Sequence, residues 1–376
     1  MSTPNGTIDR EHVLQALGTV MDPDLNRDLV SLNMIRDLAI DGDRVSLRVV
    51  LTTPACPMKD KIRGDVETAL AKIGVHGPQI TMDAEVRKPV GPSKAAPNAR
   101  LPGVGAIIAV ASGKGGVGKS TVATNLALSL SKTGASVGLL DADIYGPSMP
   151  VMFGLQGAEP EVVNEGGKAS IIPLKRHGVG IMSMGFMLED DQAVVWRGPM
   201  LGKALQQFIE DVSWGPLDYL IIDMPPGTGD VALSLAQLVP VSGAVVVTTP
   251  QDVAFADVRR AIRMFTMTKT PIFGLVENMS HFVCDGCQKS HEIFGKSRIE
   301  AHASQYDLEV LGKMPLDGVT AVAADKGEPI VVSNPEGVQA SAYLALAQRV
   351  AQKIAVETAN KENPADKFSN FFQMKR

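Results

Sequence analysis

The sequence Gly113-Lys-Gly-Gly-Val-Gly-Lys-Ser120 lies between an apolar run at 106–111 and a helix-like run at 121–130. Glycines let backbone N–H groups converge on phosphate oxygens without Cβ clashes, and the positive end of the following helix adds its dipole. Lys119 can then reach the β and γ phosphates of a nucleotide, and Ser120 can ligate Mg²⁺. The stretch therefore predicts a phosphate-binding loop for ATP between a strand and a helix.

The same glycines also fit a dinucleotide-binding pattern. Gly113, Gly115 and Gly118 have the spacing of a Rossmann fingerprint, and Asp141 follows at the end of the next apolar run. By spacing alone this pattern describes an NAD site, so an NAD-dependent oxidoreductase is an alternative interpretation.

Two features favour the triphosphate. Lys119 and Ser120 directly follow the last glycine, which suits a triphosphate with Mg²⁺ and is not needed for a pyrophosphate. Further along, Asp223 ends an apolar run, where its carboxylate can join the Mg²⁺ shell, and Gly227 follows with an N–H that could sense the γ phosphate. Together they predict a P-loop nucleotide hydrolase.

Short apolar runs alternate with helical patterns through most of the chain. The runs lie at 106–111, 137–140, 219–222, 244–248 and 272–276, and a closing helix is expected at 337–356. This alternation is typical of βαβ units. We therefore expect an α/β P-loop domain over residues 104–360, with a mostly parallel sheet covered by helices.

Residues 1–87 are predicted to form a small α+β domain. Asp41-Gly42 lies between two β-type runs and is a strong signal for a tight hairpin. The expected elements are a helix at 8–21, strands at 34–40 and 44–51, a helix at about 57–73 and a strand at 79–86. A proline-rich linker at 88–103 follows, and a polar tail occupies residues 361–376.

Composition and charge limit the partners. The net charge of −5 and the pI of about 5.7 argue against a nucleic-acid surface. No stretch has the roughly 20 apolar residues that a membrane helix needs, and no leader pattern is present at the start. Three cysteines in 376 residues indicate thiols kept reduced rather than a disulfide framework. These features predict a cytoplasmic protein that binds neither nucleic acid nor membrane.

A Cys-x-x-Cys pair, Cys284 and Cys287, follows the last apolar run. In a reducing compartment such a pair is redox-active, half of a metal site, or incidental. With His281 and His291 it could also form a zinc site within one chain. The spacing leaves these alternatives open.

Several motifs together resemble one family. The additional lysine, Lys114, makes the phosphate loop similar to the deviant Walker A loop of the MinD, ArsA and nitrogenase-iron-protein class of dimeric ATPases. The segments at 141–148, 223–230 and 277–280, followed by Cys-x-x-Cys, resemble the Mrp/ApbC iron–sulfur cluster carriers. Residues 1–86 resemble the small domain at the N-terminus of many bacterial members of that family.

The resemblance implies roles for individual residues. Lys114 would cross a dimer interface to the partner's nucleotide, and Asp143 would position or activate the attacking water. Asp141 could support the metal shell or cap the next loop, and Asn278 would contact the adenine. The implied nucleotide-binding set is Gly113, Lys114, Gly115, Gly116, Val117, Gly118, Lys119, Ser120, Thr121 and Asn278, with Ser120 and Asp223 at Mg²⁺.

The resemblance also implies a function. Cys284 and Cys287 from two copies would supply the four thiolates of a [4Fe–4S] cluster that bridges a homodimer. The expected activity is ATP-dependent transfer of the cluster to apo-proteins, with scaffold proteins as further partners. A MinD-like positioning switch is the alternative, and the tail with Phe368, Phe371 and Phe372 is expected to be a frayed end rather than its membrane anchor.

Cys56 precedes Pro57 at the expected start of the second helix. As an N-cap its sulfur would lie at the positive helix end, which lowers a thiol pKa. The resemblance places a cysteine at a similar position in related small domains. We therefore expect a reactive or cluster-handling thiol.

Overall fold

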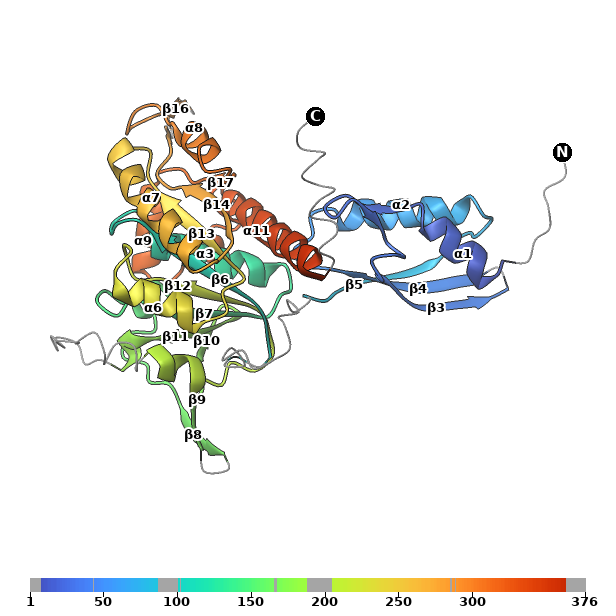
Figure 1. Ribbon diagram of the computed structural model, residues 1–376, viewed down its shortest axis with the longest axis horizontal. Coiled ribbons are helices and arrows are strands. Elements are labelled where there is room, and N and C mark those ends of the chain that lie inside the picture. The colour runs from blue at the N-terminus through green and yellow to red at the C-terminus, as the bar shows by residue number, and fades with distance from the viewer. Residues whose placement is uncertain are drawn as a thin grey trace. The chain divides into compact units, whose positions relative to one another are not determined.

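Figure 1 shows the computed structural model of the chain. It describes residues 8–42, 44–86, 101, 103–165, 168–187, 205–284, 286–287 and 289–362. The chain forms two compact units, one of residues 1–87 with 351–376 and one of residues 88–350. Most of the expected linker and most of the expected tail, including Phe368, Phe371 and Phe372, lie outside the described residues.

The first unit contains a three-stranded sheet of order β3-β4-β5, in which β3 and β4 are antiparallel and β4 and β5 parallel. The β3–β4 hairpin turns at Gly42, whose φ of +59° is the left-handed conformation that the Asp-Gly signal predicts. The elements are α1 (Arg10–Leu17), β1 (Met21–Asp22), β2 (Arg27–Asp28), β3 (Ile35–Asp41), β4 (Arg44–Leu51), α2 (Lys59–Ala71) and β5 (Gln79–Ala84).

Both α1 and α2 lie on the same side of this sheet (Figure 1). Alternate residues of β4 are buried, as expected for a strand with one covered face. They share one apolar core with the two helices, which includes Val13, Leu17, Val45, Leu47, Val49, Ile62, Val66 and Leu70.

Helix α1 is shorter than the expected span of 8–21. It begins after Asp9, whose carboxylate accepts a hydrogen bond from the His12 N–H, and it ends at Gly18. The chain then turns into β1, so Val20 reaches the core from outside the helix. A strand pairing between Met21 and Asp28 overrides the helical spacing of the apolar residues there.

The second unit is built on an eight-stranded sheet of order β10-β11-β7-β12-β6-β13-β14-β17, parallel throughout except that β10 is antiparallel to β11. Every residue of β6 is buried, as expected for a strand covered on both faces. The strands are β6 (Val104–Ser112), β7 (Val137–Asp141), β10 (Leu174–Arg176), β11 (Val179–Ser183), β12 (Leu217–Asp223), β13 (Gly243–Thr248), β14 (Ile272–Glu277) and β17 (Val310–Lys313).

Helices pack against this sheet. Helix α3 contacts β6, β7 and β12, and α7 contacts β6 and β13. The helical elements are α3 (Lys119–Lys132), α4 (Met149–Met152), η1 (Met184–Phe186), α6 (Asp230–Leu238), α7 (Asp252–Met267), α8 (Ile299–Ser304), α9 (Gly318–Asp325), α10 (Ile330–Ser333) and α11 (Val338–Glu362). The α/β architecture expected from the sequence is confirmed.

Several strands were not predicted. Strands β10 and β17 are short and partly exposed at the edges of the sheet, so they lack the continuous apolar runs of the central strands. A separate hairpin, β8 (Val162–Glu165) and β9 (Lys168–Ile171), projects from the second unit in Figure 1. Its residues are largely polar or exposed, so no apolar pattern marks it.

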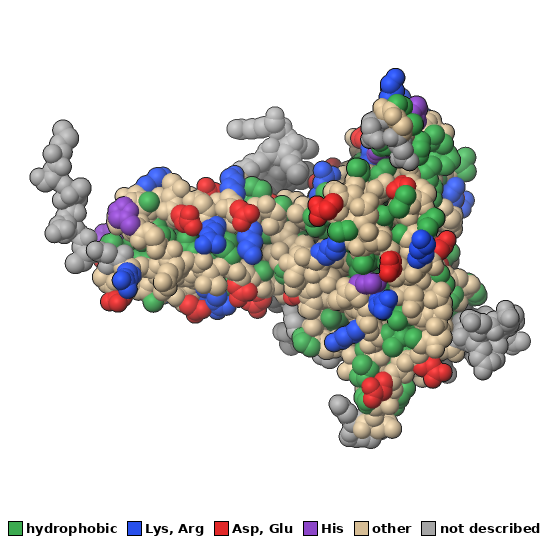
Figure 2. All heavy atoms as spheres, turned by 180° about the vertical axis from the view of Figure 1, so that it is seen from behind, with side chains coloured by type: hydrophobic (Ala, Val, Ile, Leu, Met, Phe, Trp, Pro, Cys, Tyr) green, Lys and Arg blue, Asp and Glu red, His purple; other side chains and the backbone are tan. Residues whose placement is uncertain are grey.

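Positive and negative side chains are interspersed on the face shown in Figure 2. Among the described helices, none is both long and apolar enough to cross a membrane. The expected absence of nucleic-acid and membrane partners stays a prediction.

Candidate nucleotide and cluster sites

The phosphate-binding loop connects β6 to α3. Helix α3 begins at Lys119, with Gly118 as its N-cap at φ +82° and no side chain accepting from its first N–H groups. Gly116 also has a positive φ, of +79°. These backbone conformations favour glycine, and they leave uncapped N–H groups at the positive end of a helix, where an anion binds.

Two of the loop glycines are also required by close contacts from other elements. A Cβ on Gly113 would lie 2.3 Å from the carbonyl carbon of Asp257 in α7. A Cβ on Gly118 would lie 2.1 Å from Nδ2 of Asn278, which donates a 2.9 Å hydrogen bond to the Val117 carbonyl. The loop is therefore held between α7 and the end of β14.

Lys119 is buried, and its ammonium is surrounded by oxygens. Nζ lies 2.6 Å from Oδ1 of Asp223, 3.6 Å from Oδ2 of Asp143 and 3.3 Å from Oγ of Ser120. Because β12 pairs directly with β6, Asp223 ends beside the loop that Lys119 closes. The structure thus brings together four residues that the sequence placed in one site.

Three carboxyl groups share this edge of the sheet, at Asp141, Asp143 and Asp223. Burial, with the Asp223 charge second, raises the pKa of Asp141 to about 7. Burial also raises the pKa of Asp143 and of Asp223, while the Lys119 ammonium opposes both shifts. The single ammonium of Lys119 therefore lies near three buried carboxyl groups and opposes the rise in their pKa.

Asp141 organises the neighbouring loop. Its two carboxylate oxygens accept hydrogen bonds from the backbone N–H groups of Asp143, Ser148 and Met149 and from the Ser183 hydroxyl. Of the two roles left open for Asp141, the geometry favours the loop cap.

The residues present fit a Mg²⁺ ion. Oδ2 of Asp223 is buried and has no hydrogen-bond partner among the described residues. The Ser120 hydroxyl lies nearby, 3.3 Å from the Lys119 ammonium that Asp223 also contacts. Carboxylate and hydroxyl oxygens are the hard ligands that Mg²⁺ prefers. Ser120 and Asp223 are the residues that would hold the ion.

A pocket of about 140 Å³ adjoins the phosphate loop. Asn278 and Thr121, both expected from the sequence, line this pocket, which we call the base pocket, and so does the connection 314–317 between β17 and α9. The Thr320 hydroxyl, also in its lining, is buried without a partner among the described residues. The sequence did not predict that residues 314–317, Thr320 or the α11 residues Gln339 and Tyr343 line this pocket, because they follow the phosphate loop by about 200 residues.

The two cysteines lie on a small hairpin after β14. Cys284 and Cys287 occupy the connection between β15 (Phe282–Val283) and β16 (Ser290–His291). Cys284 is half-buried and Cys287 is exposed. No group of three or more His, Cys, Asp or Glu side chains in the described part of the chain is arranged to hold a metal, so the four candidate zinc ligands do not form a cluster in this conformation.

Lys114 differs from Lys119 in its surroundings. Its side chain is half-buried beside the exposed Gly115 and Gly116. Its backbone carbonyl accepts from the Ser112 hydroxyl, which fixes the loop. Within the part of the chain that the structure describes, the Lys114 ammonium makes no ion pair or hydrogen bond.

The N-cap position and the lowered pKa expected for Cys56 are wrong. The N-cap of α2 is Met58, and Cys56 lies before it with its N–H bonded to the Thr53 carbonyl. Burial raises the pKa of the Cys56 thiol to about 11, and the nearby Asp24 and Asp22 add to the shift. The thiol is half-buried and protonated rather than activated.

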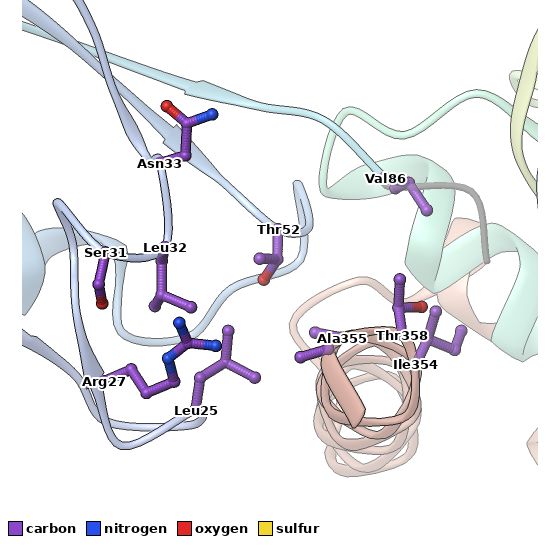
Figure 3. A pocket seen from close by; sticks show the side chains of 11 residues that line it. Leu25, Arg27, Ser31, Leu32, Asn33, Thr52, Val86, Ile354, Ala355 and Thr358 are labelled. Carbon is purple, nitrogen blue, oxygen red and sulfur yellow. The ribbon is translucent and has the colours of Figure 1, made fainter. Parts of the chain in front are cut away.

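A separate hollow of about 330 Å³ lies in the first unit (Figure 3). Arg27 and Leu25 approach it from one side and residues of α11 from the other. None of the residues that line it is a Cys, His, Asp or Glu, so it offers no thiolate, imidazole or carboxylate ligand for iron.

Comparisons with known proteins agree along nearly the whole chain. A family described as the NUBPL iron-transfer P-loop NTPase (ParA) matches residues 103–351, and one described as iron-sulfur cluster assembly protein matches residues 10–77. Two proteins named iron-sulfur cluster carrier protein are similar. The one from Deinococcus radiodurans is 50% identical, covering 92% of this chain and 96% of that protein. The one from Synechocystis is 47% identical, covering 92% and 97%.

A solved structure is also similar. It is a nucleotide-binding protein from Archaeoglobus fulgidus in complex with ADP, 40% identical, with a TM-score of 0.56. The match covers 63% of this chain and 91% of that one.

Replacing Lys119 tests the buried ion pair. Lys119→Met leaves the Asp223 carboxylate buried without its cation, so we expect the free energy of unfolding to fall by about 3–5 kcal/mol. Both tryptophans, Trp196 and Trp214, belong to the second unit, so their fluorescence in urea reports its unfolding. Lys119→Met with Asp223→Asn should recover part of the loss. Equal stability of the single variant and the parent protein would contradict the interpretation.

The pKa of Cys56 predicts slow alkylation. At pH 8 a thiol of pKa about 11 carries about 100-fold less thiolate than one at the ordinary 9.0. The rate with iodoacetamide, followed by peptide mass spectrometry, should rise about tenfold for each unit of pH up to about 10. The same protein unfolded in urea is the control and should react at the ordinary rate. Equal rates at pH 8 in both states would rule out the raised pKa.

Proposed function

Because the chain belongs to the family of NUBPL-type iron-transfer P-loop NTPases, we propose that it carries iron–sulfur clusters to apo-proteins, using ATP binding and hydrolysis as the switch of a homodimer. The observation that carries the proposal is the pairing of two features at one sheet edge. A phosphate loop with a buried Lys119 lies at the end of β6, and an exposed Cys-x-x-Cys hairpin follows β14.

The nucleotide half of the proposal starts from the phosphate loop. The loop N–H groups and Lys119 bind the phosphates, and Asn278 with the pocket beside it receives the base. Ser120 and Asp223 would hold Mg²⁺, which would supply positive charge to the phosphates. Asp143, buried beside Lys119, would accept a hydrogen bond from the attacking water. Water adds to the γ phosphorus, the bond to the β-phosphate oxygen breaks, and ADP and phosphate are the products.

The cluster half requires two copies. Cys284 and Cys287 supply two thiolates, whereas a [4Fe–4S] cluster takes four. Two copies related by a two-fold axis would bring both pairs together. The Lys114 ammonium, which has no partner among the described residues, would then find one in the second copy's nucleotide.

Exposure of Cys287 supports transfer rather than storage, because a receiving apo-protein must reach the cluster. We place the activity in the cytoplasm, where the thiols stay reduced. Scaffold proteins would supply the cluster.

Removal of either cysteine tests the cluster site. Cys284→Ser or Cys287→Ser should abolish the bound cluster and its visible absorption, because each removes one of the thiolates. Reconstituted parent protein should hold about four irons per dimer. Iron, sulfide and zinc are measured after anaerobic purification, together with ADP binding, which should persist in both variants.

Cys56→Ser is the matched control and should keep the cluster, since Cys56 belongs to the first unit. Stoichiometric zinc in a monomer that depends on His281 and His291 would instead favour the zinc site. Binding of NAD in preference to ADP would favour the oxidoreductase.

Replacing Lys114 tests the interface. Lys114→Ala should retain most of the ATP binding but lose turnover, because a cation supplied across an interface acts mainly on the transition state. Trans-acting cations contribute about 10³–10⁵ in rate, so we expect a loss of up to about 10³-fold. Phosphate release and ATP affinity are measured, with the exposed Lys175→Ala as control. Equal losses in binding and turnover would make Lys114 an ordinary ligand of its own nucleotide.

A further inference from the structure

The cysteines lie on an exposed excursion of the chain, residues 282–296, which we call the cysteine segment. Apart from the half-buried Phe282, Val283 and Cys284, its described residues are exposed. Its internal order consists of the β15–β16 pairing, a hydrogen bond from the Cys284 N–H to the Lys289 carbonyl and a turn at Gly295. Its position on the molecule must therefore be set where it begins and ends.

The segment begins at the wall of the base pocket. The Ser280 N–H and hydroxyl both donate to the Met314 carbonyl, at 2.9 and 3.0 Å. The Leu316 N–H donates to the His281 carbonyl at 2.7 Å. Met314 and Leu316 line the base pocket, so a base bound there contacts the connection after β17, to which Ser280 and His281, just before the segment, are bonded.

The segment ends at the carboxylate of Glu277. The Ser297 hydroxyl donates a 2.6 Å hydrogen bond to Oε1 of Glu277 and accepts one from the Ile299 N–H, which starts α8. Glu277 is the last residue of β14, directly before Asn278, and is 1% exposed. Both ends of the cysteine segment are thus attached to the same strand end, beside the base pocket and the phosphate loop.

Ser297 donates the hydrogen bond to one oxygen of the Glu277 carboxylate, Oε1. Oε2 of Glu277 is buried and has no partner among the described residues. A buried carboxylate without a donor is unfavourable, so the bond to Ser297 has a strong reason to persist. Two further contacts hold the start of α8, from Arg298 to Asp252 of α7 and from Glu300 to Lys313 of β17.

We propose that Glu277 and Ser297 are positioning residues that close the base of the cysteine segment, so that occupancy of the base pocket changes the exposure of Cys284 and Cys287. Both ends of the segment are attached at the end of β14. A shift of residues 314–316, which line the base pocket, therefore moves the whole segment together. Without the Glu277–Ser297 bond the far end is held only from Arg298 onward, through the contacts of α8, and the same shift is absorbed in the segment. The inference rests on the proposed use of the two cysteines and names how nucleotide regulates them.

The test uses the full-length protein without cluster and measures alkylation of each cysteine by iodoacetamide, with and without saturating ADP. Peptide mass spectrometry separates Cys284 and Cys287 from Cys56, which serves as an internal reference in the first unit. In the parent protein ADP should change the rate at Cys284 or Cys287 by about fivefold or more, the lower range of coupling between sites.

Ser297→Ala should bring the ratio of rates with and without ADP to about one. The affinity for ADP should stay within about twofold, because Ser297 does not line the pocket. Ser297→Thr, which keeps the hydroxyl, and Glu277→Gln, which keeps an acceptor, should each retain most of the effect of ADP on the alkylation rate. Glu277→Ala should abolish this effect. Ser290→Ala, an exposed serine within the segment, is the matched control and should behave as the parent protein.

Two outcomes would overturn the inference: no effect of ADP on either cysteine in the parent protein, or a full effect of ADP in Ser297→Ala. Because alkylation needs no cluster, these outcomes are independent of whether the cysteines bind iron. Loss of iron in Cys284→Ser tests that separately.

Discussion

The buried ion pair between Lys119 and Asp223 is the interaction on which the rest of the site depends. An ammonium and a carboxylate are taken out of water here, and each would be strongly unfavourable without the other. Their 2.6 Å contact requires that β6 and β12 be neighbours in the sheet and that both end at the same level. Parallel strands meet that requirement, because their carboxyl ends share one edge.

The excess of carboxyl groups over ammonium groups has a chemical consequence. Asp141 accepts hydrogen bonds from three backbone N–H groups of its own loop and from the Ser183 hydroxyl of β11, and its pKa rises to about 7 because it is buried beside Asp223. Asp223 keeps one oxygen without a partner among the described residues, and Asp143 is buried beside the same ammonium. The site therefore suits a divalent cation and a polyanion together, which is the requirement of phosphoryl transfer.

Close packing connects the Lys119–Asp223 pair and the phosphate loop to the neighbouring elements at this edge of the sheet. Because Gly113 and Gly118 lack side chains, α7 and Asn278 pack directly against the phosphate loop. Asn278 is the residue after Glu277, so the loop, the base pocket and the base of the cysteine segment meet within a few residues of the end of β14. Lys119 and its carboxylates are buried, whereas Cys287 is exposed and Cys284 half-buried, which suits the proposed transfer of a cluster.

The sequence by itself determined the features that depend on neighbours in the chain. The buried strands β6, β7, β12, β13 and β14, the phosphate loop with Lys119 and Ser120, and the Asp-Gly hairpin were predicted, because apolar runs and glycines act on local backbone geometry. The buried strand β11 was not predicted. Only the tertiary structure decided the rest. The pKa of Cys56 is raised because the thiol is half-buried near Asp24 and is not the N-cap of α2, and α1 stops early because β1 pairs with β2. The base pocket and the Glu277–Ser297 bond join segments far apart in sequence, and no local pattern encodes a contact that arises when separate elements pack together.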